Sequence, residues 1–177
     1  MKFVAISGSW RKVNKEIERK VRKIVQQILK RGNGIVTGGA LGVDYIALDE
    51  ALKHDKNAQR IKVFLPTTLK RYAQHLRKHA RWGDVKKSAV EKLISKLKKL
   101  KALNKKAIIE NKKANFNEET KKKYYYQRNT KIIKAADELI AFRVITKESQ
   151  GLGTLDAIKK AKKKRIKVKI FEYDFRK

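Results

Sequence analysis

The sequence predicts an α/β fold in which a doubly wound, mostly parallel sheet is covered by helices on both faces. Two observations predict this class. Short apolar runs of strand length alternate with longer segments whose apolar residues recur at helical spacing. Glycine or other small residues follow three of these runs, where a parallel strand must turn into its crossover helix. Because such crossovers are right-handed, we expect the five predicted strands in the order 3-2-1-4-5.

The strands are expected at residues 2–9, 35–37, 61–65, 138–144 and 166–173. The first is nearly continuous in apolar residues, as a strand buried on both faces requires. The last alternates apolar and charged residues, which is typical of an outer strand with one face in water. Apolar spacing places helices at residues 15–31, 43–54, 90–107, 124–136 and 153–161, with Asn14 as the N-cap of the first.

The three small-residue turns are the predicted binding site. The carboxyl ends of parallel strands form one crevice, so turns that are distant in sequence should converge there. Free N–H groups at the helix starts favour a phosphate or another anion. The carboxylate of Asp44 either caps its helix or accepts a hydrogen bond from a ligand hydroxyl. The predicted ligand-binding residues of the turns are Gly8, Ser9, Gly38, Gly39, Ala40, Gly42, Asp44, Gly153 and Thr154.

The composition of the chain excludes several protein classes. Its 177 residues include no cysteine, so it has neither a disulfide framework nor a thiolate metal site. No apolar run approaches the ~20 residues that span a bilayer, and the chain begins with a strand-like run instead of a signal peptide. We expect a cytoplasmic protein with one domain over residues 1–177, no cofactor and no membrane contact.

The charge balance is strongly basic, with 48 Lys and Arg against 17 Asp and Glu and a formal net charge of +31. A thermophile-like bias would raise Glu together with Lys, which is not the case in this chain. The surplus predicts attraction to polyanions, most simply single-stranded DNA or RNA. Phosphate contacts of this kind supply affinity without reading the bases.

Basic residues are densest in a predicted helical insertion at residues 69–123. The wider range 69–134 carries 22 Lys and Arg against 5 Asp and Glu. Apolar residues at three- and four-residue steps from Val90 to Ala107 predict one long amphipathic helix with a narrow apolar seam. The helix either covers the core or forms an arm for a homodimer. Residues 111–123 are expected to form a loop.

A cluster of aromatic and basic residues at 121–128 suits single-stranded nucleic acid, because aromatic rings among cations stack on unpaired bases. One of its three tyrosines is expected to pack under the sheet edge instead. The predicted nucleic-acid contacts are Lys98, Lys99, Lys105, Lys106, Lys121, Lys122, Lys123 and Tyr125.

Two of the three histidines, His75 and His79, have the i, i+4 spacing that can hold a metal on one helix face. No acidic residue stands beside them at ligand spacing, and Arg77 and Lys78 surround them with positive charge. We therefore predict no metal site.

The same motifs resemble those of the SLOG superfamily, Rossmann-like nucleotide-binding domains that include the DNA-processing protein DprA and the LOG phosphoribohydrolases. Ser7-Gly8-Ser9 resembles the first turn of the family, and residues 38–44 resemble its glycine-rich turn in the form ending with Asp that DprA shares. Arg128-Asn129 resembles the Arg-Asn helix of DprA, and residues 153–158 resemble the Gly-Thr turn and helix of LOG proteins. The resemblance spans most of residues 2–173 apart from roughly 69–123 and implies a Rossmann-like fold.

The resemblance implies two functions for the turns. In a DprA-like protein Arg128 and Asn129 would join the turns in binding a nucleotide or nucleic acid. In a LOG-like enzyme Arg128 and Asp156 would be catalytic and would cleave nucleoside 5'-monophosphates. The chain lacks the Pro-Gly-Gly of LOG enzymes, and Asp156 replaces their longer Glu, whose placement the reaction needs. A small-nucleotide sensor is a third alternative, and we favour a binding protein that contacts phosphates through its turns and basic surface.

Overall fold

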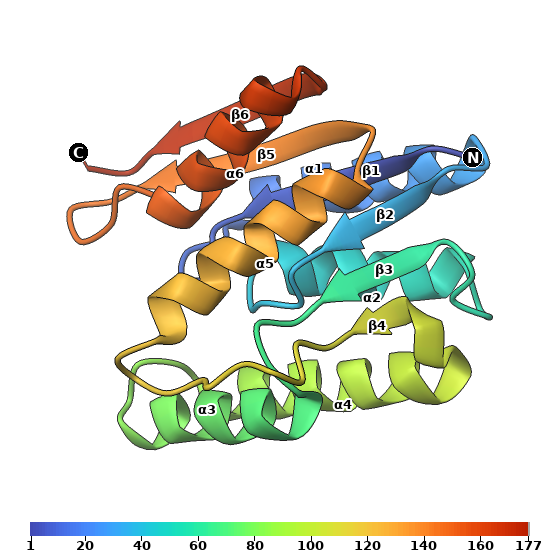
Figure 1. Cartoon of the computed structure of the whole chain (residues 1–177). Helices are drawn as coiled ribbons and strands as arrows, with labels where there is room; N and C mark the ends of the chain where they lie inside the picture. Colours follow the sequence, from blue (N-terminus) through green and yellow to red (C-terminus); the bar gives the residue numbers. More distant parts are fainter. Residues whose placement is uncertain (177) are drawn as a thin grey trace.

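A computed structural model describes residues 1–176, and a single six-stranded sheet forms its centre (Figure 1). All strand pairs are parallel, in the order β4-β3-β2-β1-β5-β6. The predicted order of five strands is confirmed, and a two-residue edge strand, β4, adds to it. The strands are β1 (Phe3–Gly8), β2 (Gly34–Thr37), β3 (Ile61–Phe64), β4 (Ile108–Ile109), β5 (Glu138–Ile145) and β6 (Lys167–Asp174).

Helices cover both faces of the sheet, so the predicted α/β, doubly wound architecture is confirmed. Helices α5 and α6 lie on one face, α1 and α2 lie on the other, and α3 and α4 pack beside the β4 edge (Figure 1). The helices are α1 (Lys15–Lys30), α2 (Val43–His54), α3 (Leu69–Arg81), α4 (Lys87–Leu103), the short 3₁₀ helix η1 (Lys105–Ala107), α5 (Lys121–Ala135) and α6 (Leu152–Lys164).

The alternation of side chains along each strand divides the core into two clusters. Ile35 on β2 packs with α1, α2 and α4, whereas its neighbour Val36 packs with α5 and α6 on the opposite face. The predicted N-cap is also confirmed, because Asn14 Oδ1 accepts a hydrogen bond from Ile17 N at 2.9 Å. That cap starts α1 with its apolar stripe toward the first cluster.

The predicted helix through Ala107 is too long. Helix α4 ends at Leu103, and Asn104 then reverses the chain by accepting from Lys106 N and donating to Ala58 O. The chain thereby enters β4. Within the predicted helical insertion, Leu69–Arg81 forms a separate helix whose bounds were not predicted. The seam of α4, including Leu93 and Leu97, is fully buried in the core of its own chain, which favours the core-covering alternative. The loop after β4 ends three residues earlier than expected, since α5 begins at Lys121.

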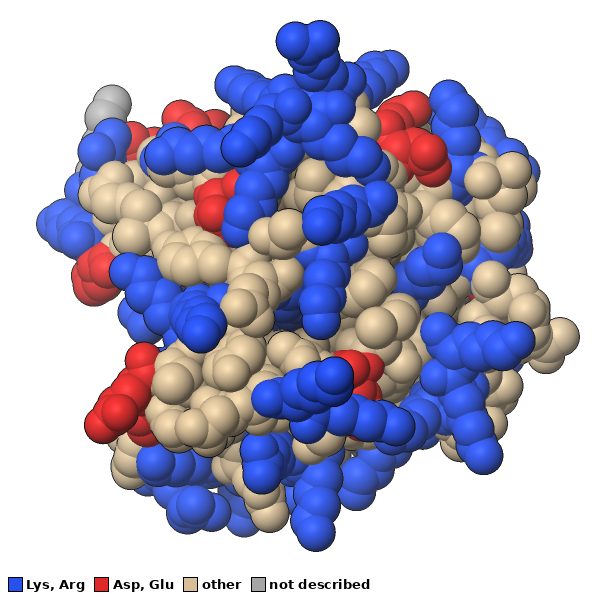
Figure 2. Space-filling model, viewed as in Figure 1, with Lys and Arg blue, Asp and Glu red and all other residues tan. Residues whose placement is uncertain are grey.

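Positively charged side chains dominate the charged groups on the visible face of the molecule (Figure 2). Figure 2 shows Lys and Arg side chains spread over the whole visible face, with few Asp and Glu among them. Because 17 acids face 48 cations, most of the basic side chains lack an acidic partner of their own. No helix of residues 1–176 is both long and apolar enough to cross a membrane.

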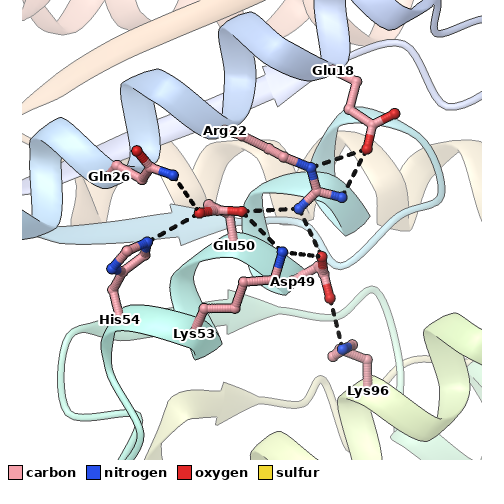
Figure 3. A network of polar contacts seen from close by, with 8 residues as sticks. All are labelled: Glu18, Arg22, Gln26, Asp49, Glu50, Lys53, His54 and Lys96. Atoms are coloured by element: carbon pink, nitrogen blue, oxygen red, sulfur yellow. Dashed lines mark hydrogen bonds and ion pairs between the residues drawn. The ribbon is translucent and has the colours of Figure 1, made fainter.

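The densest charge pairing joins α1, α2 and α4 (Figure 3). Arg22 Nη1 donates to Asp49 at 2.7 Å and to Glu50 at 3.0 Å, and its other nitrogens donate to Glu18. Lys96 of α4 donates to the second Asp49 oxygen at 2.8 Å. The far oxygen of Glu50 contacts Gln26 and His54. This set of eight residues, the α1–α2 charge network, is completed by Lys53.

Candidate functional site

The three predicted turns converge at the carboxyl edge of the sheet. The chain winds from β1 toward β4 and later returns to β5 on the other side of β1, so β1 and β5 flank the point where the winding reverses. Sheets of this kind bind ligands there. A cavity of about 420 Å³, the switch-point cavity, lies at this point and is lined by nine of the predicted residues. These nine are Gly8, Ser9, Gly38, Ala40, Asp44, Arg128, Asn129, Gly153 and Thr154.

Close backbone packing explains the glycines of the turns. A Cβ on Gly42 would collide with the carbonyl oxygen of Ser9, and the φ of Gly42 is +71°. A Cβ on Gly8 would lie 2.6 Å from Val43 Cγ2, so the start of α2 can rest against the end of β1. Gly39 likewise packs on Val63. Gly39 and Gly42 therefore shape the turn without lining the switch-point cavity.

Asp44 holds the glycine turn in place. Its Oδ2 accepts hydrogen bonds from Gly38 N at 3.0 Å and Ala40 N at 3.3 Å. The carboxyl is buried, which raises its pKa, while the positive charge of Arg128 acts in the opposite direction. The carboxylate thus fixes the residues before the helix instead of capping the helix itself, while a hydrogen bond to a ligand hydroxyl stays a prediction.

Arg128 lies at the centre of the crevice. Its guanidinium packs on the backbone of Gly38, where a Cβ would be 2.7 Å from Cζ, and Nη1 donates to Gly38 O at 3.1 Å. The opposite side of the guanidinium lies 5.0 Å from the ring centre of Tyr125. Its buried Nε has no hydrogen-bond partner in the described structure. This arrangement leaves an oriented, charged donor beside the cavity.

Asn129 and Asp156 are bonded to each other. Asn129 Nδ2 donates to Asp156 Oδ2 at 3.0 Å and to Gly153 O at 3.2 Å, which links α5 to the start of α6. Lys160 Nζ also donates to Asp156 Oδ2 at 2.7 Å. Asp156 lines neither the switch-point cavity nor the second cavity that adjoins it.

A second cavity of about 510 Å³, the aromatic cavity, adjoins the first and shares Arg128, Ala40 and Gly153 with it. Rings and cations line it together, including Trp10, Tyr126, Lys121 and Lys122. Burial raises the pKa of Tyr125 to about 12, so that ring stays neutral. The sequence analysis missed Trp10, although its position directly after the Ser-Gly-Ser turn placed it at the strand end.

The predicted basic contacts fall into two groups. Lys121, Lys122 and Tyr125 line the aromatic cavity, and Lys123 is exposed on the same turn of α5. Lys105 and Lys106 precede β4, at the amino edge of the parallel sheet, and Lys98 and Lys99 lie in the last turns of α4 (Figure 1). The second group is therefore exposed at the opposite edge from the crevice, and its role stays a prediction.

The histidine pair has acidic neighbours that the sequence did not reveal. Glu118, from the loop before α5, lies 3.4 Å from His75 Nδ1 and 3.7 Å from His79 Nε2. Asp84 lies 2.6 Å from His79 Nδ1. No acid stands at ligand spacing along the helix, but the loop before α5 returns to α3 and brings Glu118, 39 residues after His79, next to both histidines.

Comparisons with known proteins give a family match and several solved structures with a similar fold. The profile of the family described as DNA recombination-mediator protein A matches residues 1–177. DNA processing protein A from Helicobacter pylori, solved for its single-stranded DNA binding mode, superposes with a TM-score of 0.65 at 21% identity. That match covers 96% of this chain and 64% of the other, so the chain spans about two thirds of that protein.

Two further solved structures are similar. The protein TM1055 superposes with a TM-score of 0.53 at 15% identity, covering 95% of this chain and 72% of its own. DNA processing protein A from Streptococcus pneumoniae superposes with a TM-score of 0.48 at 19% identity, and that match covers 94% of this chain and 58% of the other. No curated protein is similar enough in sequence to count as a match.

Proposed function

We propose a single-strand-binding function for this chain, which belongs to the DNA recombination-mediator protein A family. A backbone phosphate would occupy the switch-point cavity, and unpaired bases would lie against the rings of the aromatic cavity. The excess of positive charge around both cavities would supply the sequence-independent part of the affinity.

Arg128 is the observation that carries this proposal. Its planar guanidinium is already oriented by Gly38 and Tyr125, so little side-chain freedom would be lost on binding. The guanidinium has five N–H groups, and those that do not bond to the protein can donate to a phosphate oxygen. The N-terminus of α6 opens into the same cavity at Gly153 and Thr154, and its helix dipole favours an anion there.

The aromatic cavity favours a single strand over a duplex. Tyr125 and Tyr126 line it next to Lys121 and Lys122, and only an unpaired base can insert a face against such rings. Each stacked base contributes roughly 1–3 kcal/mol, with little preference among bases. The Helicobacter pylori relative binds single-stranded DNA, which supports the same ligand for this chain.

A titration of one protein against four ligands tests the proposal. Single-stranded DNA, single-stranded RNA, duplex DNA and nucleoside monophosphates are compared at fixed salt by fluorescence anisotropy or calorimetry. We expect Arg128→Ala to weaken single-strand binding about 10- to 100-fold, the effect of losing charge-assisted hydrogen bonds. Arg19→Ala, which removes the same charge from the exposed face of α1, serves as the matched control.

The outcomes separate the alternatives. Equal affinity for duplex and single strand, or equal losses in Arg128→Ala and Arg19→Ala, would refute a specific single-strand site. Binding of monophosphates alone would favour the nucleotide sensor. Higher affinity for single-stranded RNA than for single-stranded DNA would identify RNA as the ligand.

The geometry speaks against the phosphoribohydrolase alternative. Lys160 and Asn129 hold the carboxylate of Asp156, and that side chain does not line either cavity. We expect no base release from nucleoside monophosphates, and Asp156→Asn should leave single-strand affinity nearly unchanged. Base release that is abolished by Asp156→Asn would reverse this assignment.

A homodimer through residues 69–123 also remains part of the proposal. Because the apolar seam of α4 is buried in its own core, such a dimer would have to use other exposed surfaces of the insertion, which are rich in Lys and Arg. Sedimentation with and without a single strand tests this, since a nucleic acid would be needed to offset the repulsion between two basic surfaces.

A further inference from the structure

We propose that His75, His79 and Glu118 form a binding site for a divalent transition-metal ion, of which Zn²⁺ is the best match. The inference is independent of the proposed nucleic-acid function. It rests on two histidines one turn apart on α3 and on a glutamate that is distant in sequence but adjacent in the fold.

The three side chains present one ligand atom each within 4.8 Å of one another. In a tetrahedral site with bonds of about 2.0–2.1 Å, two ligand atoms lie about 3.4 Å apart. The separation of 3.4 Å between His75 Nδ1 and Glu118 Oε1 already has this value, and that of 3.7 Å from His79 Nε2 is close to it. Small side-chain rotations would bring all three atoms around one ion.

The surroundings prepare His79 as a ligand. Asp84 Oδ2 contacts Nδ1 of His79 at 2.6 Å and thereby favours the tautomer that leaves Nε2 unprotonated. Carboxylate–histidine–metal arrangements orient the ligand in the same way. The Nε2 atom is buried and has no hydrogen-bond partner in the described structure. An unprotonated, buried nitrogen without a donor is a site for a metal ion.

His75 is prepared in a different way. Its ring is held edge-on between His79, at 4.5 Å between centroids, and Phe116, at 5.0 Å. Its Nδ1 faces Glu118 Oε1 at 3.4 Å, so this nitrogen is already directed toward the other proposed ligands. Two imidazoles and one carboxylate match the preference of Zn²⁺ for nitrogen and oxygen ligands.

Two lysines compete with an ion for Glu118. Lys121 Nζ lies 2.6 Å from its Oε2, and Lys78 Nζ lies 3.7 Å from the Oε1 atom assigned to the metal. The same Nζ of Lys78 lies 4.5 Å from the ring centre of Trp82, a contact that does not depend on Glu118. Metal binding would therefore remove the weaker contact of Lys78 with Oε1 and leave Lys121 on the other oxygen.

The proposed ion would face the aromatic cavity, because His75 and His79 both line it. Three protein ligands leave a fourth coordination position for water or for an oxygen of a bound phosphate. The site would thus place a positive charge at the end of the cavity away from Arg128.

The test uses the full chain without an added histidine tag. Co²⁺ is titrated as a spectroscopic probe, because tetrahedral coordination gives strong visible absorption, and Zn²⁺ is titrated by calorimetry. We expect one ion per chain. Glu118→Gln, a change in an exposed loop that preserves shape, and His79→Ala should abolish the tetrahedral spectrum. Asp84→Asn should weaken Zn²⁺ affinity about 10- to 100-fold, the usual effect of losing the partner of a metal-bound histidine.

Two further variants sharpen the test. His54→Ala removes the remaining histidine, which pairs with Glu50 on α2, and should leave the spectrum unchanged. Lys78→Gln should strengthen Zn²⁺ binding, because it removes the competing cation. The proposal is overturned if the wild type shows no saturable one-to-one binding, or if His54→Ala reduces binding as much as His79→Ala. Circular dichroism of each variant confirms that the fold is retained.

Discussion

Helix α2 carries two buried carboxylates whose surroundings have opposite effects. Asp44, in its first turn, is 5% exposed, and Glu50, near its other end, is 3% exposed. Burial raises the pKa of Asp44 despite the nearby charge of Arg128. Burial also disfavours ionised Glu50, but hydrogen bonds from Gln26, His54 and Arg22 outweigh it and lower its pKa to about 2.

The difference separates a structural region from a functional one. At Glu50 the interactions of the α1–α2 charge network outweigh the cost of burying the ionised carboxylate, so that region stabilises the fold. At Asp44 the cost of burial is not fully offset, and the positive charge of Arg128 is left available to a ligand in the crevice. Buried ionisable groups whose pKa stays perturbed are frequent at functional sites, because a bound ligand supplies the interactions that are missing in the free protein.

Removal of Arg22 should have the largest effect on stability. Arg22→Ala leaves Asp49 and the buried Glu50 without their shared guanidinium, and breaking such a pair costs about 3 kcal/mol. Arg19→Ala, one turn away on the exposed face, should change the free energy of unfolding by less than about 0.5 kcal/mol. Denaturant titration measures both, and equal values would show that the network is not stabilising.

The same neutralising change should act in opposite directions at the two carboxylates. Glu50→Gln replaces an ionised group that its partners favour, and we expect it to lower the free energy of unfolding by about 2 kcal/mol. Asp44→Asn removes an ion that burial disfavours while an amide oxygen can still accept from Gly38 N and Ala40 N. Its stability should be unchanged or higher. A loss at Asp44 as large as that at Glu50 would contradict the comparison.

The pH dependence of stability should follow the network. The pKa values of Glu50 and Asp49 are both about 2, below their unfolded values near 4, so their contribution is complete above about pH 4.5. It is lost as pH falls toward about 2, because the unfolded chain then binds protons first. Denaturation of the wild type and Arg22→Ala between pH 2 and pH 5 should show a flatter slope in the variant.

The smallest effect is expected from lysine pairs at the two edges of the sheet. Each phosphate contact to a single strand contributes about −0.7 to the slope of log affinity against log salt. Lys121→Gln with Lys122→Gln, beside the aromatic cavity, should reduce that slope by about 1.4. Lys105→Gln with Lys106→Gln, at the amino edge, should change it less. If the pair at the amino edge reduced the slope more than the pair beside the cavity, the contact surface would lie at the amino edge and would include the predicted contacts Lys98 and Lys99.

The sequence predicted what depends on local patterns and on chain topology. Alternating strands and helices predicted the sheet order, and that order brought Gly8, Gly38 and Gly153 to one edge. The two-residue strand β4 was missed because Ile108–Ile109 is too short to show a period. Contacts between distant side chains were also missed. The approach of Glu118 to His75, and of Arg22 to Glu50, depends on packing that neither segment encodes alone.

The central claim is that a phosphate binds where the turns meet, and the glycine amides report on this directly. In a ¹⁵N-labelled sample, resonances of Gly38, Gly151 and Gly153 should shift during titration with a short single-stranded oligonucleotide, because these residues line the switch-point cavity. Gly32, just before β2, and Gly34, its first residue, lie at the opposite edge of the sheet, and their resonances should not move. Shifts confined to the surface lysine segments, with the cavity glycines unchanged, would contradict the account.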